Sequence, residues 1–204
     1  MKLIFPIVLA GTLAATTSSA ATLTDTTGAA TSSNRAMGAA TNIGIGQTWF
    51  STSDGVLDSI EVYLTPLFSS MAGPVEITVL DYATFSSLAS INVDRSSFLS
   101  PGSGDQSVVV DFSSFGVGLT NGTEYALEVT SGEDNIFSWS RTADNSYGGT
   151  WYDIETSGRG AESNFRDFAL DVYTVAPVPL PPGLAMMLSG VGALGLLRRR
   201  LKSK

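Results

Sequence analysis

Short runs of alternating apolar and polar residues dominate the middle of this chain. In Val56–Thr65, for example, Ile60, Val62 and Leu64 fall on one face. Alternation with a period of two is typical of strands that bury one face. Gly, Pro, Asn, Asp and Ser bound each run, and no long helical pattern intervenes. We therefore predict an all-β body, with strands over residues 47–51, 56–65, 75–81, 88–93, 107–112, 124–130, 136–141, 151–154 and 167–174.

Strands at this spacing favour an antiparallel β-sandwich of jelly-roll type, with a closed barrel as the alternative. Residues 47–176 form the predicted sandwich domain. Thr120–Thr123 contains Asn-Gly, which tolerates positive φ and predicts a turn. Residues 21–46 are rich in Ala, Thr, Ser and Asn and show little periodicity. We expect them to form a flexible lead-in that can contain one edge strand.

The first 20 residues have the pattern of a secretory signal peptide. One Lys precedes an apolar core from Leu3 to Ala15, and small residues follow at Ser18–Ala20. This pattern predicts cleavage after Ala20 or Ala21. An uncleaved anchor helix is the alternative, although the apolar run is short.

The last 28 residues, 177–204, combine a proline-rich box, an uncharged apolar segment and a basic end. The segment Gly183–Leu197 would make a helix of about 22 Å, short of a hydrocarbon core of about 30 Å. Leu180, Leu201 and arginines that snorkel to the headgroups bring it close to that thickness. Such a basic end stays in the cytoplasm, so we predict a C-terminal transmembrane helix. Its membrane stop comprises Arg198, Arg199, Arg200 and Lys202.

This order of box, apolar segment and arginine cluster resembles the PEP-CTERM sorting signals of exported bacterial proteins. It is most similar to the variant whose box reads Val-Pro-Leu-Pro-Ala. The matching residues are Val178, Pro179, Leu180 and Pro181, whereas Pro182 departs from the fifth position. The resemblance implies that a membrane-embedded exosortase cuts near this box. The protein would be exported, held transiently at the inner membrane, and then found at the cell surface or in the extracellular matrix. A plain anchor that is never cut is the alternative.

The body is also similar to jelly-roll domains that often precede such tails, some of them related to carbohydrate-binding sandwiches. The similar segments are Gln47–Phe50, Asp54–Ile60, Leu119–Tyr125, Asn145–Gly149 and Asp167–Leu170.

Charge and composition restrict the chemistry of the body. The chain has 11 basic and 19 acidic residues, but six of the basic ones lie in the two terminal segments. The body therefore carries five arginines against all 19 acids, near −14, which argues against nucleic acid as a partner. The chain has no Cys and no His, so thiol nucleophiles, zinc fingers and Ser-His-Asp triads are excluded.

Aromatic residues gather with polar ones in Trp139–Phe165. Aromatic faces beside amides and carboxylates suit a sugar ring and its hydroxyls. The candidate ligand-binding residues are Trp151, Tyr152, Tyr147 and Asp144, and a glycan lying over Trp151 and Tyr152 is the working hypothesis. In the simpler interpretation, Trp139 belongs to the core and Trp151 caps one end of the sandwich.

No sequence motif points to a cofactor or an enzyme. A structural calcium is the alternative to no cofactor, with Asp144–Ser146 and Glu133–Asn135 as oxygen clusters, although neither matches a twelve-residue calcium loop. No phosphate loop or nucleophile elbow is present. We expect a non-enzymatic surface or matrix protein. A carbohydrate-binding module is the second hypothesis, and a hydrolase with two facing carboxylates is the third.

Overall fold

The structure, a computed structural model, describes residues 20–37, 42–66, 73–94, 105–131, 137–142, 149–163 and 167–176. Residues Ala21–Pro177 form one compact unit, and the predicted signal peptide and all but the first residue of the predicted C-terminal segment fall outside it. Apart from Ala20, those two segments also lie outside the described residues. Within the described residues, no helix has the length and apolar character needed to cross a bilayer.

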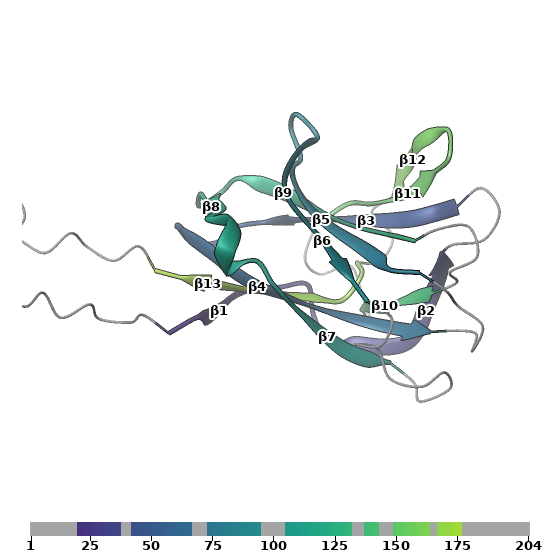
Figure 1. Cartoon of the computed structure of the whole chain (residues 1–204), viewed down its shortest axis with the longest axis horizontal. Coiled ribbons are helices and arrows are strands. Elements are labelled where there is room, and N and C mark those ends of the chain that lie inside the picture. The colour runs from purple at the N-terminus through teal and green to yellow at the C-terminus, as the bar shows by residue number, and fades with distance from the viewer. Residues whose placement is uncertain are drawn as a thin grey trace, which may run out of the picture. The chain divides into compact units, whose positions relative to one another are not determined.

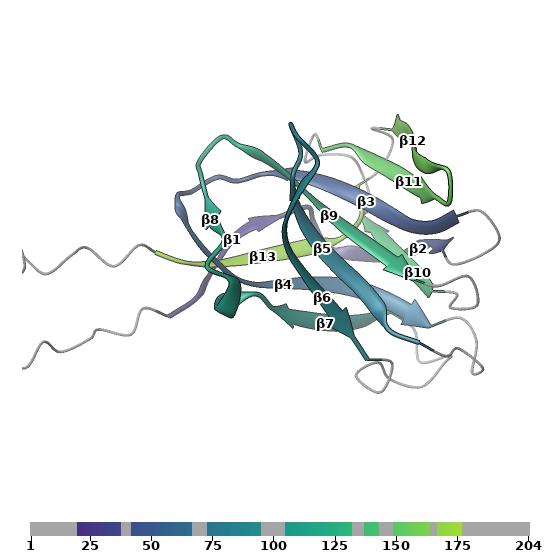
Figure 2. The same ribbon diagram turned by 45° about the horizontal axis from the view of Figure 1, so that its top comes forward.

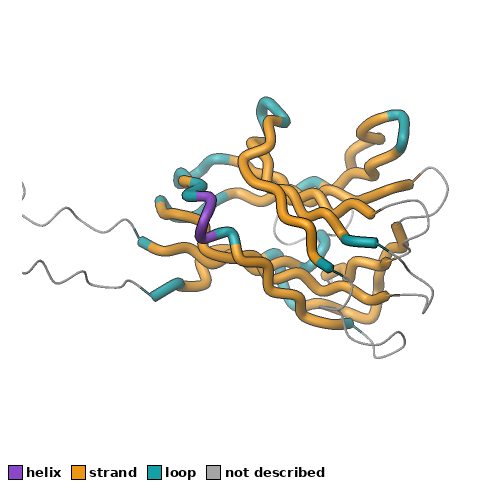
Figure 3. The backbone as a smooth tube through the Cα atoms, in the orientation of Figure 1, coloured by secondary structure: helices purple, strands orange, loops and turns teal. Residues whose placement is uncertain are grey.

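The described body is all-β, as the alternation predicts, with a single turn of 3₁₀ helix (Figure 3). The elements are β1 (Thr22–Thr26), β2 (Ala30–Met37), β3 (Asn42–Phe50), β4 (Gly55–Pro66), β5 (Val75–Asp81), β6 (Ser86–Val93), β7 (Gln106–Asp111), η2 (Ser113–Phe115), β8 (Gly118–Leu119), β9 (Glu124–Ser131), β10 (Phe137–Thr142), β11 (Trp151–Glu155), β12 (Gly158–Ser163) and β13 (Leu170–Val175).

The first sheet, sheet A, is built around the long strand β4. Strands β8 and β7 pair with one side of β4, and β13 and β10 pair end to end with its other side. Strand β1 then pairs with β13, and β2 pairs with β10. The first and last strands of the body are therefore neighbours, with Thr22 opposite Thr174. Figure 1 shows the start of β1 and the end of β13 at the same end of the body.

The second sheet, sheet B, has the strand order β12-β11-β3-β9-β5-β6. Hairpins form its two outer pairs, β5–β6 and β11–β12, and every pairing in both sheets is antiparallel. Figure 1 shows the two sheets as an upper and a lower layer, and in Figure 2 strands β5 and β6 of sheet B cross in front of sheet A. This arrangement is consistent with the predicted β-sandwich.

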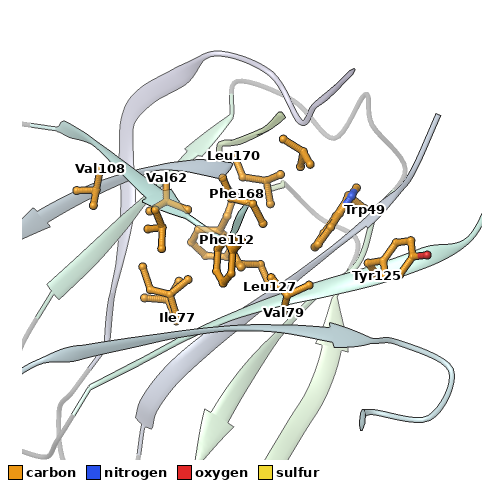
Figure 4. Close-up of a cluster of buried hydrophobic side chains, with 14 of the residues drawn as sticks. Trp49, Val62, Ile77, Val79, Val108, Phe112, Tyr125, Leu127, Phe168 and Leu170 are labelled. Atoms are coloured by element: carbon orange, nitrogen blue, oxygen red, sulfur yellow. The ribbon is translucent and has the colours of Figure 1, made fainter. Parts of the chain in front are cut away.

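The inner faces of the two sheets share one hydrophobic core (Figure 4). Ile60, Val62 and Leu64 are fully buried, as their alternation predicts. Trp139 is also fully buried and donates its indole N–H to the Ala169 carbonyl at 2.9 Å, so its assignment to the core is confirmed. Because the chain has no Cys, packing of this core has to hold the sheets together.

Residues 21–46 do not form a flexible lead-in where they are described. They contain β1, β2 and the first half of β3. The expected edge strand is therefore present, since β1 and β2 both lie at edges of sheet A, but the flexible lead-in is wrong for these described residues. The alternation of apolar and polar residues did not predict β2 or β12. Both strands are polar, lie at sheet edges and have no clear alternation. The predicted turn at Thr120–Thr123 is present, with φ of +78° at Gly122.

Candidate functional site

A second apolar cluster lies on the outer face of sheet B. Ala126 sits between Tyr125 and Leu127, whose side chains point into the core, so its own side chain points outward. Ala126 packs in a cluster with Leu80, Tyr152 and Ile154, and Ile43, Tyr82 and Phe85 pack against them. The outer face of this sheet is thus partly covered by aromatic side chains.

Tyr152 lies flat across strand β3 because β3 has no side chain beneath it. Tyr152 is opposite Gly46, and a Cβ at Gly46 would overlap the tyrosine ring. Only 1% of Tyr152 is exposed, and its hydroxyl donates to Glu128 Oε1 on β9 at 2.9 Å. Glycine in a strand often marks such a close approach.

Arg159 on β12 packs against this cluster through contacts with Glu128 and Phe85. Its Nε donates to the same Glu128 Oε1 at 2.6 Å, and its guanidinium lies 4.4 Å from the centre of the Phe85 ring. Burial, and next the Glu128 charge, raise the pKa of Tyr152 well above its ordinary value. The bond to Glu128 raises the pKa of Arg159. At neutral pH both groups are therefore protonated donors to Glu128.

Phe85 occupies an unusual backbone conformation at the β5–β6 turn. Its φ is +52°, a left-handed value that costs a bulky residue about 1–2 kcal/mol. Its ring meets those of Tyr82 and Tyr152 edge to face, at centroid distances of 5.0 and 6.0 Å. These contacts offset the strain. Backbone strain of this kind gathers at ligand-binding sites, which makes the tip of this hairpin a candidate.

We call Tyr82, Phe85, Glu128, Tyr152 and Arg159 the sheet B cluster. Tyr152 and Glu128 are buried, whereas Tyr82 and Phe85 are half-buried and Arg159 is exposed. The two accessible rings and the guanidinium are groups that can stack on a sugar ring and bind its hydroxyls. Among the described residues, no group of three or more acidic side chains could hold a metal ion.

The two predicted ligand-binding residues that the structure describes, Trp151 and Tyr152, do not come together. Successive strand residues point to opposite faces, and Trp151 packs on the core side against Phe168 at a centroid distance of 5.6 Å. Tyr152 points to the outer face and is buried. One glycan cannot stack on both rings, so that part of the hypothesis is wrong. Tyr147 and Asp144 lie outside the described residues.

Sequence reasoning missed Tyr82, Phe85 and Glu128 as partners of Tyr152. Tyr82 and Phe85 stand in a turn, and Glu128 is one outward residue in a regular strand. The one local signal was the pair of glycines at 44 and 46 in β3.

Two carboxylates meet on the outer face of sheet A. Glu61 and Asp171 are directly opposite each other on β4 and β13. Tyr63 donates its hydroxyl to Asp171 at 3.0 Å, and Tyr173 donates to Glu61 at 3.1 Å. Burial, and next the carboxylate partner, raise the pKa of both tyrosines. Each carboxylate in this pair thus already accepts a phenol hydrogen bond.

The predicted processing residues flank the described body. Ala20 is exposed and stands two residues before β1. The box residues Val178, Pro179, Leu180 and Pro181 lie outside the described residues, as do Arg198, Arg199, Arg200 and Lys202.

No family model matches this chain, and the search of curated proteins found no match. The resemblance of the tail to sorting signals therefore depends on its own residues.

Proposed function

We propose that this chain is a non-enzymatic exported surface or extracellular-matrix protein. In this proposal residues 1–20 export it as a signal peptide, and residues 177–204 anchor it in the inner membrane. An exosortase-type enzyme then processes it at the Val178–Pro181 box, which places the body at the cell surface or outside the cell. In this proposal the exported body has the fold of an antiparallel sandwich of jelly-roll type.

The extent of the compact unit carries this proposal. The unit runs from Ala21 to Pro177, so both of its limits adjoin the two predicted cutting sites. Strand β1 begins two residues after Ala20, and β13 ends at Val175, three residues before Val178. Cutting at either site would leave all described strands intact, as a processed protein requires.

Intact-mass analysis of the protein from membranes and from culture supernatant tests the proposal. We expect both ends to be missing from the released form. A variant without Gly183–Lys204 should lose its membrane-bound intermediate, and its melting temperature should equal that of the released protein. The matched control is the variant Arg198→Gln, Arg199→Gln, Arg200→Gln, Lys202→Gln. It removes the basic residues of the membrane stop but keeps the apolar segment. Identical localisation of the full chain and the truncated variant would refute the proposal.

Carbohydrate binding is a second candidate function, and the sheet B cluster favours it. The strained Phe85 holds its ring beside Tyr82 and the Arg159–Glu128 pair, which supplies both stacking and polar contacts. Binding to a panel of bacterial polysaccharides should weaken in Tyr82→Ala and Arg159→Gln. Tyr173→Phe, on the other sheet, should bind like the parent. If Trp151→Ala weakens binding whereas Tyr82→Ala and Arg159→Gln do not, the sheet B cluster is excluded as the site.

A further inference from the structure

Large exposed hydrophobic side chains concentrate at one end of the body. Among the described residues, they are Leu23, Phe50, Val56, Leu88, Val109 and Phe115. Single exposed hydrophobic residues are ordinary on a protein surface. Four of these six, however, belong to elements that meet where the chain enters and leaves the body. We call Leu23, Phe50, Val56 and Phe115 the apolar rim, and their exposed fractions run from 37% to 52%.

Strand pairing places the members of the apolar rim at this end. Leu23 is the second residue of β1 and lies opposite Tyr173, near the end of β13. Val56 is the second residue of β4 and lies opposite Val175.

The other two members belong to neighbouring turns. Phe50 ends β3, and only Ser51–Asp54 separate it from β4. Phe115 ends η2, which leads into β8, and β8 pairs with the start of β4. Figures 1 and 2 both show η2 and β8 at the end where β1 starts and β13 stops.

We propose that this end of the body rests on the lipid surface of the membrane that holds the C-terminal segment, with the apolar rim in contact with the lipid. The inference depends on the proposed function, because it needs the C-terminal segment to be inserted. The body then has a defined orientation while it waits to be cut, with its β1–β13 end on the bilayer.

The short connection between body and tail supports this orientation. Seven peptide steps separate Ala176 from Gly183, and a chain of that length spans about 25 Å at most. Strand β4 has 12 residues, which corresponds to a length of about 40 Å. An inserted tail therefore keeps the β1–β13 end nearer to the bilayer than the opposite end of the body.

Tethering makes a weak contact sufficient. A short linker raises the effective concentration of the body at the bilayer into the millimolar range. Phenylalanine and leucine side chains suit the boundary between headgroups and acyl chains. Acidic Asp54 and Asp111 are exposed at the same end, so we expect a zwitterionic surface to be preferred over an anionic one.

The absence of Cys from the chain allows a direct test. The full chain is inserted into phosphatidylcholine vesicles as the single variants Phe115→Cys, Phe50→Cys and Val109→Cys, each carrying an environment-sensitive dye. Val109 is the control, since it is 61% exposed in the middle of β7. We expect spin-labelled lipid to quench the dye at 115 and 50 several-fold more strongly than at 109. Adding phosphatidylglycerol should reduce that difference.

The outcomes separate the two proposals. Flotation of the chain with the vesicles, together with equal quenching at 115, 50 and 109, would overturn the membrane contact and leave the anchor intact. A full chain that does not float with the vesicles would overturn the anchor, and the inferred contact with it.

Discussion

Gly46 shows how a single missing side chain shapes the outer face of sheet B. The Tyr152 ring occupies the space above it, and the tyrosine hydroxyl reaches Glu128 across β3. Gly44 is similarly restricted, since an added Cβ would lie 2.6 Å from the Val129 carbonyl oxygen. At the residue scale, the geometry of the sheet B cluster depends on Gly46, whereas Gly44 allows the close approach of the β9 backbone.

We predict that Gly46→Ala lowers the free energy of unfolding by about 1–3 kcal/mol, because the new methyl group displaces the Tyr152 ring. Gly118→Ala is the matched control, since a Cβ there meets nothing within 4 Å. Urea unfolding of both variants provides the measurement. Equal stability in the two variants would mean that Tyr152 does not occupy this position.

At the scale of secondary-structure elements, the buried carboxylate of Asp25 holds strand β1 in place. Asp25 is only 3% exposed, and its Oδ1 accepts hydrogen bonds from the Thr52 backbone N–H at 2.9 Å and the Thr52 hydroxyl at 2.6 Å. The same hydroxyl oxygen also lies 3.0 Å from the Thr24 carbonyl oxygen, so its one proton is shared between the two acceptors. These bonds fasten the edge strand to the β3–β4 loop, so β1 is an integral part of the body.

Asp25→Ala should cost about 1–3 kcal/mol of unfolding free energy, because the Thr52 N–H and hydroxyl lose their charged acceptor. Asp25→Asn keeps a side-chain oxygen at this position and should cost less. Denaturant titration compares the two. No loss in either variant would support a loosely attached first strand, as the composition of residues 21–46 suggests.

Hydrogen-bonded tyrosines on both outer faces make the whole molecule sensitive to alkali. The pKa values of Tyr63, Tyr152 and Tyr173 are raised, in each case by burial first and then by a neighbouring carboxylate. A raised pKa means that the folded state keeps the phenol protonated while the unfolded chain loses its proton near pH 10. Their contribution to stability is complete below about pH 10 and is lost progressively above it.

The free energy of unfolding should therefore fall as pH rises above about 10. Tyr152→Phe should reduce the steepness of this fall, because one of the three phenols is removed. Chemical unfolding at pH 8 and at pH 11 gives both slopes. An equally steep fall in the variant would show that Tyr152 ionises alike in the folded and unfolded chains.

Alternation predicted the strands that bury one face against the core. Strands β4 and β5 follow it closely, and Val75, Ile77 and Val79 are all fully buried. Alternation did not predict β1, β2 or β12, which are polar edge strands held by backbone pairing. Their residues carry little local signal, because a ladder hydrogen bond needs no particular side chain.

The sequence by itself determined the all-β class, the core faces of the central strands and the acidic, Cys-free and His-free chemistry of the body. These properties depend on residues close together in the chain, or on composition alone. Tertiary structure decided that Tyr152 belongs with Phe85 and Glu128, that Trp151 faces the other way, and that β1 lies beside β13. Those outcomes follow from register between strands far apart in the chain, which no local pattern encodes.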